Sequence, residues 1–503
     1  MQLIIRDLIY RSPLYIISLC GLLTACDLQE EPYGFYSDDN FYKSETDAES
    51  GLLYAYNALT FLEYSRGIFY IGDIPTETMS PKSDEAGDVY QLENWIANRE
   101  TEQLQYYFKY CYIAINRANT VIDHIQNSSV LSETARRRIL GEAYFLRAWN
   151  YFNLVRTFGI VPVQTKMVAE LSQTTPPMAT GLDQLYDLIL GDLTRADNLL
   201  EVNKVFGRAD KVAAQSLMAK AYLTIASSKE HNVHRYTEMR REPRIMYDSA
   251  AYWAGKVVRD YKNVYDFDTN LRDIYDVDKP TGPEHIFIMP IDRSGTQEGN
   301  YSKLPLLFLP SNNSVPFYIR YGNGDLQRAN GNGWGVFLCN DEFVETQFST
   351  TDKRRTELIH RDIYDASGNP IVPNQVKGYF SSKYVDPNFI GERTSARPYL
   401  IRFSDIALVY AEAAGPEAGL AYVNRIRERA GVTPLPSGMT TDKFREAVIK
   451  ERALELAFEG NRLYDLRRTA SVTTTDIKAA GLSEAEAAYY PIPQREIDLN
   501  PNL

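Results

Sequence analysis

The sequence predicts a mainly α-helical protein, built from divergent tetratricopeptide-like helical hairpins, with a loop-rich variable lobe that contains short strands. Apolar residues recur at helical spacing along much of the 503-residue chain. Small alanines beside large aromatics allow the close helix contacts of tetratricopeptide hairpins. One stretch, at about 265–398, is instead dominated by glycine, asparagine, aspartate and proline, a composition typical of loops.

The first 25 residues have the features of a secretory signal. Arg6 and Arg11 precede an uncharged apolar run at 14–25. That run is shorter than the roughly 20 residues that a helix needs to span a membrane. We therefore expect this segment to be a signal peptide rather than a membrane helix.

The end of this run, LTAC at 23–26, resembles a bacterial lipobox, in which small residues precede a cysteine that receives a lipid. The sequence therefore predicts a lipoprotein signal peptide at 1–25, lipid attachment at Cys26 and a lipid-anchored linker at 26–45. The alternative is an ordinary signal peptide that holds a cysteine near its end.

The acidic run DLQEEP at 27–32 resembles the export signal that directs lipoproteins of Bacteroidota to the outer face of the outer membrane. A solvated linker would look similar. Because two or three acyl chains anchor a protein stably, we expect one domain at 46–503 that is lipid-anchored to the outer membrane and faces the cell exterior.

Helices are predicted in order along this domain. The pattern indicates helical pairs at about 102–158 and 183–228, a further helical segment at 248–262, a pair at 404–430 and a helix at 441–468. The clearest periodicity is that of Leu140, Ala143, Tyr144, Ala148, Tyr151, Phe152 and Val155. Gly159 with Pro162, and Gly415-Pro416, are helix stop signals. Within 265–398, GPEHIFIMPIDR predicts a short strand.

Composition excludes several classes of protein. The net charge of −12 argues against nucleic-acid binding, which needs clustered Lys and Arg. Of four cysteines, Cys20 lies in the signal and Cys26 in the lipobox, so a disulfide scaffold is excluded. The sequence leaves open whether Cys111 and Cys339 form a bond. The 36 tyrosines carry an apolar face and a polar tip, and we expect most of them to fill helix–helix contacts.

Six motifs stand in order along the domain. They are GEAYFLRAWNYFNLVRTFGIVPV (141–163), KVAAQSLMAKAYL (211–223), RPYLIRFSDIALVYAEAA (397–414), AYVNRIRERAG (421–431), IKERALELAFEGNRLYDLRR (449–468) and YYPIPQREIDLNPNL (489–503). Together, behind a lipobox, they resemble the SusD/RagB family of outer-membrane nutrient-binding lipoproteins. The chain stops at Leu503, a few residues earlier than is usual after the family's Asn-Pro, and 265–398 matches loosely.

The resemblance implies a SusD-like α-α superhelix of four tetratricopeptide-like units, a variable ligand-facing lobe at about 265–398 and C-terminal family motifs at 397–503. It also implies a function. Such proteins are not enzymes; they capture glycans, or peptides in the RagB branch, and pass them to a SusC-like TonB-dependent β-barrel transporter.

The sequence contains no recognisable catalytic or metal motif. Glu459, Arg462, Asp465 and Arg468 are spaced by three and on one helix predict a ladder of opposite charges, rather than the two separated carboxyls of a glycosidase. His231 and His234 lack a clustered third ligand, and DVDKPTGPE at 276–284 lacks the EF-hand order of a calcium loop. We expect no cofactor and no metal.

Binding is expected at aromatic side chains with polar neighbours in two loop regions, because ring faces stack on sugars and unpaired hydroxyls are costly away from water. The resemblance places ligands between an early loop and a mid-chain segment. The candidates are Asp84, Tyr90 and Trp95, beside Glu85, in 73–95, and Tyr318, Arg320, Tyr321, Asn323 and Asp325 in 316–325.

Three candidates also have structural interpretations. Trp95 and Tyr321 suit a core as well as a ligand site, and Trp334, within Gly-Trp-Gly, resembles a structural motif of the family.

Two rival functions remain, a lipid-anchored glycoside hydrolase and a tetratricopeptide scaffold that binds only proteins.

Overall fold

The computed structural model describes residues 41–82, 87–297, 299–372 and 378–503. The chain divides into two units, Met1–Lys43 and Ser44–Leu503. In the first, the rings of Phe41 and Tyr42 meet edge to face at 4.7 Å. Cys26 and the predicted signal lie outside the described residues. The helices and strands of the described residues belong to the second unit.

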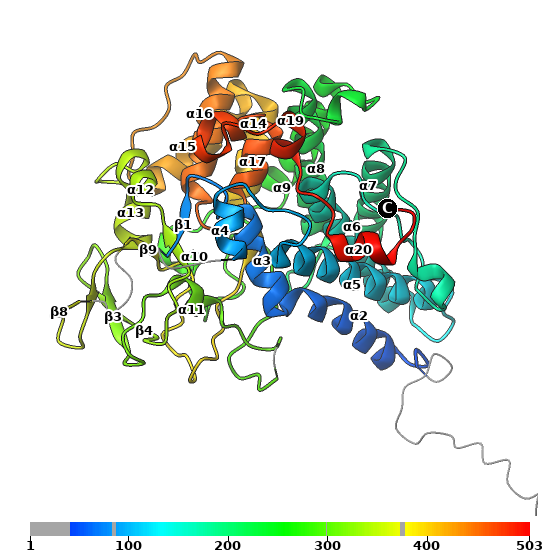
Figure 1. Cartoon of the computed structure of the whole chain (residues 1–503), viewed down its shortest axis with the longest axis horizontal. Helices are drawn as coiled ribbons and strands as arrows, with labels where there is room; N and C mark the ends of the chain where they lie inside the picture. Colours follow the sequence, from blue (N-terminus) through cyan, green and yellow to red (C-terminus); the bar gives the residue numbers. More distant parts are fainter. Residues whose placement is uncertain (1–40, 83–86, 298, 373–377) are drawn as a thin grey trace, which may run out of the picture. The chain divides into compact units, whose positions relative to one another are not determined.

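Long helices form a continuous array in the first half of this unit (Figure 1). They are α2 (Glu45–Thr60), α3 (Leu62–Gly72), α5 (Glu102–Ile125), α6 (Glu133–Phe158), α7 (Leu182–Leu199), α8 (Lys211–Glu230) and α9 (Pro243–Asp260). From α5 to α9 each helix contacts the next one along the chain, as in stacked helical hairpins. The predicted pairs at 102–158 and 183–228 are therefore confirmed.

Local sequence explains where these helices begin and end. The Asp210 carboxylate accepts a hydrogen bond from the Ala213 N–H and caps α8, which satisfies one of the free N–H groups of its first turn. At the other end of a helix, α6 stops at Gly159, whose φ of 77° lies in the left-handed region that favours glycine. Helix α6 is buried on nearly all sides, because α2, α5 and α7 surround it.

The C-terminal helices are α14 (Phe403–Ala414), α15 (Pro416–Arg429), α16 (Thr441–Glu455) and α17 (Arg462–Arg468). The apolar α14 contacts α8 and α9 on one side and α15 and α16 on the other. It thereby joins the C-terminal helices to the array.

The predicted single helix at 441–468 is wrong, because the chain leaves helical geometry between α16 and α17. Phe458 and Gly460 have φ values of 65° and 75°. A Cβ at Gly460 would lie 2.3 Å from Ile68 Cγ2, so α3 approaches this turn too closely for any other side chain. The periodicity continues across the turn, but contact with α3 ends the helix.

Strands are short and lie mostly in the middle of the chain. One sheet has the order β4 (Leu326–Ala329), β3 (Phe317–Arg320), β7 (Ile363–Tyr364), β8 (Pro370–Ile371). Three antiparallel pairs complete the set: β1 (Met79–Pro81) with β5 (Phe337–Cys339), β2 (His285–Ile288) with β10 (Tyr399–Arg402), and β6 (Ile359–His360) with β9 (Phe380–Ser381). The strand predicted in GPEHIFIMPIDR is β2.

Short helices fill the connections. They are α4 (Asp88–Glu93), α10 (Leu271–Ile274), α11 (Leu304–Phe308), α12 (Asp341–Gln347), α13 (Lys353–Leu358), α18 (Val472–Thr475), α19 (Glu484–Ala488) and α20 (Gln494–Leu499), with 3-10 turns η1 (Leu171–Thr174), η2 (Tyr236–Glu238) and η3 (Ile477–Ala479). The mainly α fold class with short strands is thus confirmed.

Two further properties of the described residues concern disulfide bonds and membrane-spanning helices. Cys111 and Cys339 are both buried and free, so neither forms a disulfide in this structure. Within the described part of the chain, none of the helices combines the length and the apolar character needed to cross a membrane.

Candidate functional site

The outer face of the β4-β3-β7-β8 sheet carries a cluster of tyrosines and arginines. Along β3, Phe317 and Ile319 are buried, whereas Tyr318 is half-buried and Arg320 exposed. This alternation follows from the two-residue period of a strand. Tyr318 stands opposite Arg328 of β4 and Tyr364 of β7, so these three side chains share one face of the sheet.

Arg320 closes one edge of this surface. Its guanidinium lies 4.2 Å from the centre of the Tyr364 ring, and its Nη2 donates a hydrogen bond to the Gly368 carbonyl at 2.5 Å. On the opposite side, the Arg328 guanidinium lies 4.2 Å from the Phe389 ring centre. We call Tyr318, Arg320, Arg328 and Tyr364 the tyrosine face.

The turn between β3 and β4 places the next two predicted site residues together. Asn323 Nδ2 donates to Asp325 Oδ2 at 2.6 Å, and Arg272 Nη2 donates to the same oxygen at 3.1 Å. These two hydrogen bonds hold the pKa of the exposed Asp325 carboxyl below its usual value. The turn therefore presents fixed polar groups next to the tyrosine face.

Tyr321 lies in the core beneath the hairpin rather than on its surface. It is 5% exposed, its ring meets that of His360 edge to face at 5.3 Å, and the Arg272 guanidinium lies 4.6 Å from its centre. Its hydroxyl donates to Gln327 Oε1. Burial raises the pKa of Tyr321 to about 12 and lowers that of His360 to about 4. The ring of Tyr321 supports the hairpin from below.

Trp95 is also buried, with 8% of its surface exposed. Its ring stacks on Tyr490 at 6.2 Å and 23°, and its Nε1–H donates to Asp476 Oδ2 at 3.3 Å. Its φ of 56° is unusual for a bulky residue, and these contacts hold it there. Trp95 thus connects the early segment to the C-terminal end of the chain.

The early segment is more regular than the predicted loop, because β1 and α4 occupy parts of 73–95. Tyr90 on α4 is 51% exposed. Asp84 and the neighbouring Glu85 lie outside the described residues. Figure 1 shows α4 and β3 in different parts of the fold, so Tyr90 is not part of the tyrosine face.

Replacing Trp95 by phenylalanine tests the structural role of its indole. The change keeps an aromatic ring against Tyr490 and removes the N–H that donates to Asp476. We expect the free energy of unfolding to fall by about 1 kcal/mol, measured by urea denaturation, with ligand affinity unchanged. Trp253→Phe on α9 is the matched control. A loss of affinity with unchanged stability would instead place Trp95 at the ligand.

Trp334 is intermediate between the two interpretations. Its side chain is 37% exposed, and its backbone N–H donates to the Leu306 carbonyl at 2.5 Å. The adjacent Gly333 is required by packing, since a Cβ there would lie 2.0 Å from the Leu309 carbonyl oxygen. The Gly-Trp-Gly segment thus has a structural role in its backbone, and its ring remains partly accessible.

The predicted charge ladder is wrong except for its last step. Glu459 precedes α17 and pairs with Lys383 and Arg402, while Arg462 pairs with Glu77. Within α17, the Asp465–Arg468 contact at 2.9 Å is present. The helix break places Glu459 in a different buried cluster, where Lys383, Arg402 and the Tyr275 hydroxyl all donate hydrogen bonds to it.

His231 and His234, which were considered as metal ligands, both contact protein groups. His231 Nδ1 contacts the Ser227 carbonyl at 2.8 Å, and the His234 ring contacts Tyr489. Across the described ranges, no group of three or more His, Cys, Asp or Glu side chains is arranged to hold a metal ion.

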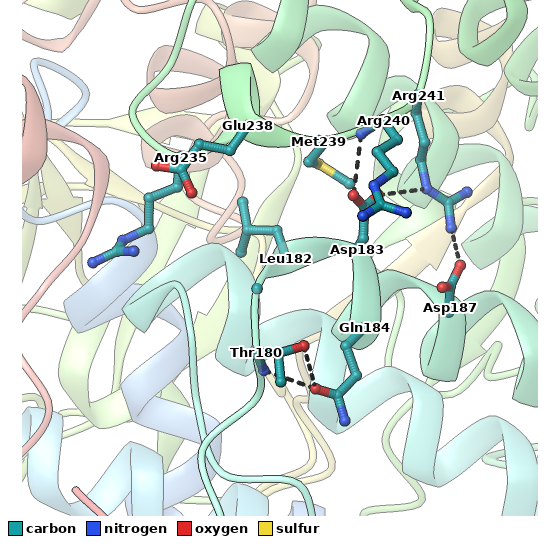
Figure 2. Close-up of a pocket in the computed structure, with 11 residues that line it drawn as sticks. Thr180, Leu182, Asp183, Gln184, Asp187, Arg235, Glu238, Met239, Arg240 and Arg241 are labelled. Carbon is teal, nitrogen blue, oxygen red and sulfur yellow. Dashed lines mark hydrogen bonds and ion pairs between the residues drawn. The ribbon is translucent and has the colours of Figure 1, made fainter.

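A separate cavity of about 650 Å³ lies between the start of α7 and the segment at 235–241 (Figure 2). Arg241 contacts both Asp183 and Asp187, and the Arg240 N–H donates to Asp183 Oδ2 at 3.1 Å. Its described lining carries charged and small polar groups but no aromatic ring. It therefore suits ring stacking less well than the tyrosine face.

Sequence reasoning missed Tyr364, Arg328 and this cavity. Tyr364 lies on a strand of two residues, too short to show alternation. Arg328 belongs to the return strand of a hairpin whose turn, GNGD at 322–325, carries a recognisable turn signal. That signal could have paired Arg328 with Tyr318.

The stacked helices define a helical-repeat protein. Comparison with known proteins identifies its family. A model described as "SusD family" matches residues 362–503, and one described as "Starch-binding associating with outer membrane" matches residues 42–223. Together the matches cover more than half of the chain. The chain belongs to the SusD-like family.

Individual relatives agree with this assignment. SusD-like protein P2 of Formosa agariphila is 24% identical over 496 residues, which cover 90% of this chain and 89% of the relative. A SusD homolog from Bacteroides thetaiotaomicron has a TM-score of 0.74 at 20% identity, covering 93% of this chain and 98% of that one. Surface glycan-binding protein A from the same species, in complex with laminarihexaose, has a TM-score of 0.70 at 20% identity, covering 90% and 97%.

The family also decides the question of catalysis. SusD-like proteins are non-catalytic binding proteins, and the prediction that this chain is not an enzyme is confirmed by its membership. The glycoside hydrolase alternative is accordingly set aside.

Proposed function

We propose that this protein captures oligosaccharides at the cell surface and hands them to a SusC-like TonB-dependent transporter in the outer membrane. The observation that carries the proposal is the match of both ends of the domain to SusD-like family models, one of them described as starch-binding. A structural relative bound to laminarihexaose supports a glycan as cargo. Cys26 would carry the lipid that anchors the protein to the outer membrane.

The tyrosine face is the proposed contact surface for the glycan. Tyr318 and Tyr364 present adjacent aromatic side chains on one face of a sheet, and an aromatic ring covers the apolar C–H face of a sugar. Arg320 and Arg328 stand beside them as hydrogen-bond donors to hydroxyls. Asn323 and Asp325 extend the polar rim at the turn.

The remaining predicted residues have supporting places in this proposal. Tyr321 holds the hairpin from beneath and Trp95 holds the early segment against the C-terminal end. Tyr90 and Trp334, which are partly exposed, and Asp84 stay as proposed secondary contacts. Because these side chains are spread along neighbouring strands, the proposed surface suits an extended oligosaccharide better than a single small sugar.

Replacing Tyr318 by alanine is expected to weaken oligosaccharide binding about fivefold, since a stacking ring contributes on the order of 1 kcal/mol. Isothermal titration against a panel of glycans and peptides measures the affinity. Tyr252→Ala is the matched control, because Tyr252 is an exposed tyrosine on α9, with 54% of its surface accessible. Equal affinities of the two variants for the bound glycan would contradict the proposed surface.

The same panel separates the alternatives. Binding of peptides in place of glycans would indicate the RagB-like branch of the family. Release of reducing ends during incubation would contradict the non-enzymatic assignment. Absence of any soluble ligand, together with co-purification of a β-barrel, would favour a scaffold that binds only proteins.

A further inference from the structure

A small cavity unrelated to the tyrosine face lies among α6, α8, α17 and the residues that follow α19. Three arginines, Arg156, Arg467 and Arg468, line it together with hydroxyl groups such as those of Ser228 and Tyr464. Its described lining includes no carboxylate. It leaves about 20 Å³ for the centre of a water-sized sphere, and roughly 10–15 Å³ already suffices for one water molecule.

Arg467 is buried here without a carboxylate partner. It is 5% exposed, and its Nε and Nη1 donate to the backbone carbonyls of Ala487, Arg156 and Thr157 at 3.2 Å. Its Nη2 has no hydrogen-bond partner. Burial lowers the pKa of this guanidinium, as expected for a charge that lacks a compensating anion.

Arg156, which is half-buried, lines the same cavity and also has no carboxylate partner among the described residues. Its guanidinium lies between the rings of Phe152 and Tyr464, 4.2 and 3.8 Å from their centres. Nη2 donates to Asn153 Oδ1 at 2.5 Å, and the buried Nε has no hydrogen-bond partner. The described contacts of Arg156 are thus with neutral groups.

Arg468, which lines the same cavity, differs from Arg156 and Arg467 because carboxylates compensate its charge. It contacts Glu412 and Asp465, which balance its charge. A neighbouring cavity of similar size shares Arg156, Tyr464 and Arg468, but Asp465 also lines it. Lys220 and Arg452 line this second cavity too, but each of them pairs with Asp405. Arg467, by contrast, has no carboxylate partner among the described residues.

We propose that the cavity beside Arg156 and Arg467 binds a small monovalent anion, with chloride as the ion that fits its size. An uncompensated buried charge is strongly unfavourable, and a counter-ion within hydrogen-bond reach removes much of that cost. The ion would accept hydrogen bonds from the two N–H groups that lack partners. It would join α6 to α17 and to the segment at 487–490, so its effect is on stability.

Bromide provides a direct test, because it replaces chloride and can be located by its anomalous scattering. Crystals of the protein grown without halide and soaked in sodium bromide should show an anomalous peak between Arg156 and Arg467. A water molecule there, with no anomalous signal, would overturn the proposal. This measurement uses the wild-type chain and does not depend on any variant folding.

Thermal unfolding of the full chain in detergent gives a second readout. At constant ionic strength, replacing sodium gluconate by about 200 mM sodium chloride should raise Tm by about 1–3 °C, as expected for an ion that binds only the folded state. Arg467→Gln should abolish the chloride-dependent increment, whereas Arg425→Gln, at an exposed ion pair, should retain it. An equal increment in both variants would show that the cavity is not the site.

Discussion

Replacing Arg402 by alanine is expected to lower the free energy of unfolding by about 3–5 kcal/mol, the range for removing one partner of a buried ion pair. Arg402 is 1% exposed. Its guanidinium donates to Glu284 Oε2 at 2.8 Å, to Glu455 Oε1 at 2.9 Å and to Glu459 Oε2 at 2.8 Å. The substitution leaves three buried carboxylates with less compensation, one directly before β2 and two at or just after the end of α16.

Urea denaturation monitored by circular dichroism measures this loss. Arg425→Ala is the matched control, because Arg425 pairs with Asp266 at the surface, where such pairs contribute less than about 1 kcal/mol. A loss below about 1 kcal/mol for Arg402→Ala would mean that Lys383 and Arg429, which also contact this cluster, compensate for the missing charge.

The charged groups around Arg402 also make the free energy of unfolding depend on pH. Arg429 and Arg402 lower the pKa of Glu455 to about 2 against the effect of burial. A carboxyl whose folded-state pKa is lowered stabilises the protein above its unfolded-state pKa, and this contribution is lost as the pH falls through the folded-state value. Glu455 therefore stays charged at neutral and mildly acidic pH.

Asp73 should show the opposite pH dependence. Burial raises the pKa of Asp73 to about 7, and the nearby Glu459 adds to this increase. Hydrogen bonds from the backbone N–H groups of Gly460 and Arg462, together with the charge of Lys383, act in the opposite direction. Because the folded state holds this proton more tightly than the unfolded chain, the contribution is present at low pH and is lost as the pH rises towards 7. Its Oδ1 has no hydrogen-bond partner, so no donor stabilises the charged form at this oxygen.

Asp73→Asn tests this expectation. Asparagine stays neutral, so the stability of the variant relative to wild type should increase by about 2–3 kcal/mol between pH 5 and pH 8. Urea denaturation at several pH values measures the difference, in which the titration of all other groups cancels. Asp248→Asn, at an exposed position on α9, is the control for removing one carboxylate. A constant difference across this pH range would show that Asp73 remains charged throughout.

The helices were the most predictable part of the fold. The apolar spacing of 140–155 and the stop at Gly159 both lie within a single segment, and α6 ends at Phe158. The turn after α16 could not be predicted in this way. Its cause is the approach of Ile68 to Gly460, a contact between residues almost 400 positions apart, and the local pattern contains no trace of it.

The exposure of the side chains on the proposed binding surface could be predicted only in part. Tyr318 and Arg320 have outward positions on a strand, in agreement with their expected accessibility. Tyr321 and Trp95 have the same aromatic chemistry but lie buried, because neighbouring elements cover them. Residue type alone does not distinguish an aromatic ring that faces solvent from one that faces another helix.

By itself, the sequence determined the fold class, the order of the helices and the resemblance to the SusD/RagB family, because helical periodicity and motif order are properties of contiguous residues. Only the tertiary structure decided which charges are compensated, which aromatic rings are exposed and where α16 ends. Each of these depends on contacts between distant segments, such as that of Arg402 with Glu284 and Glu459. Burial and charge compensation arise from the packing of the whole chain, and a local pattern cannot specify them.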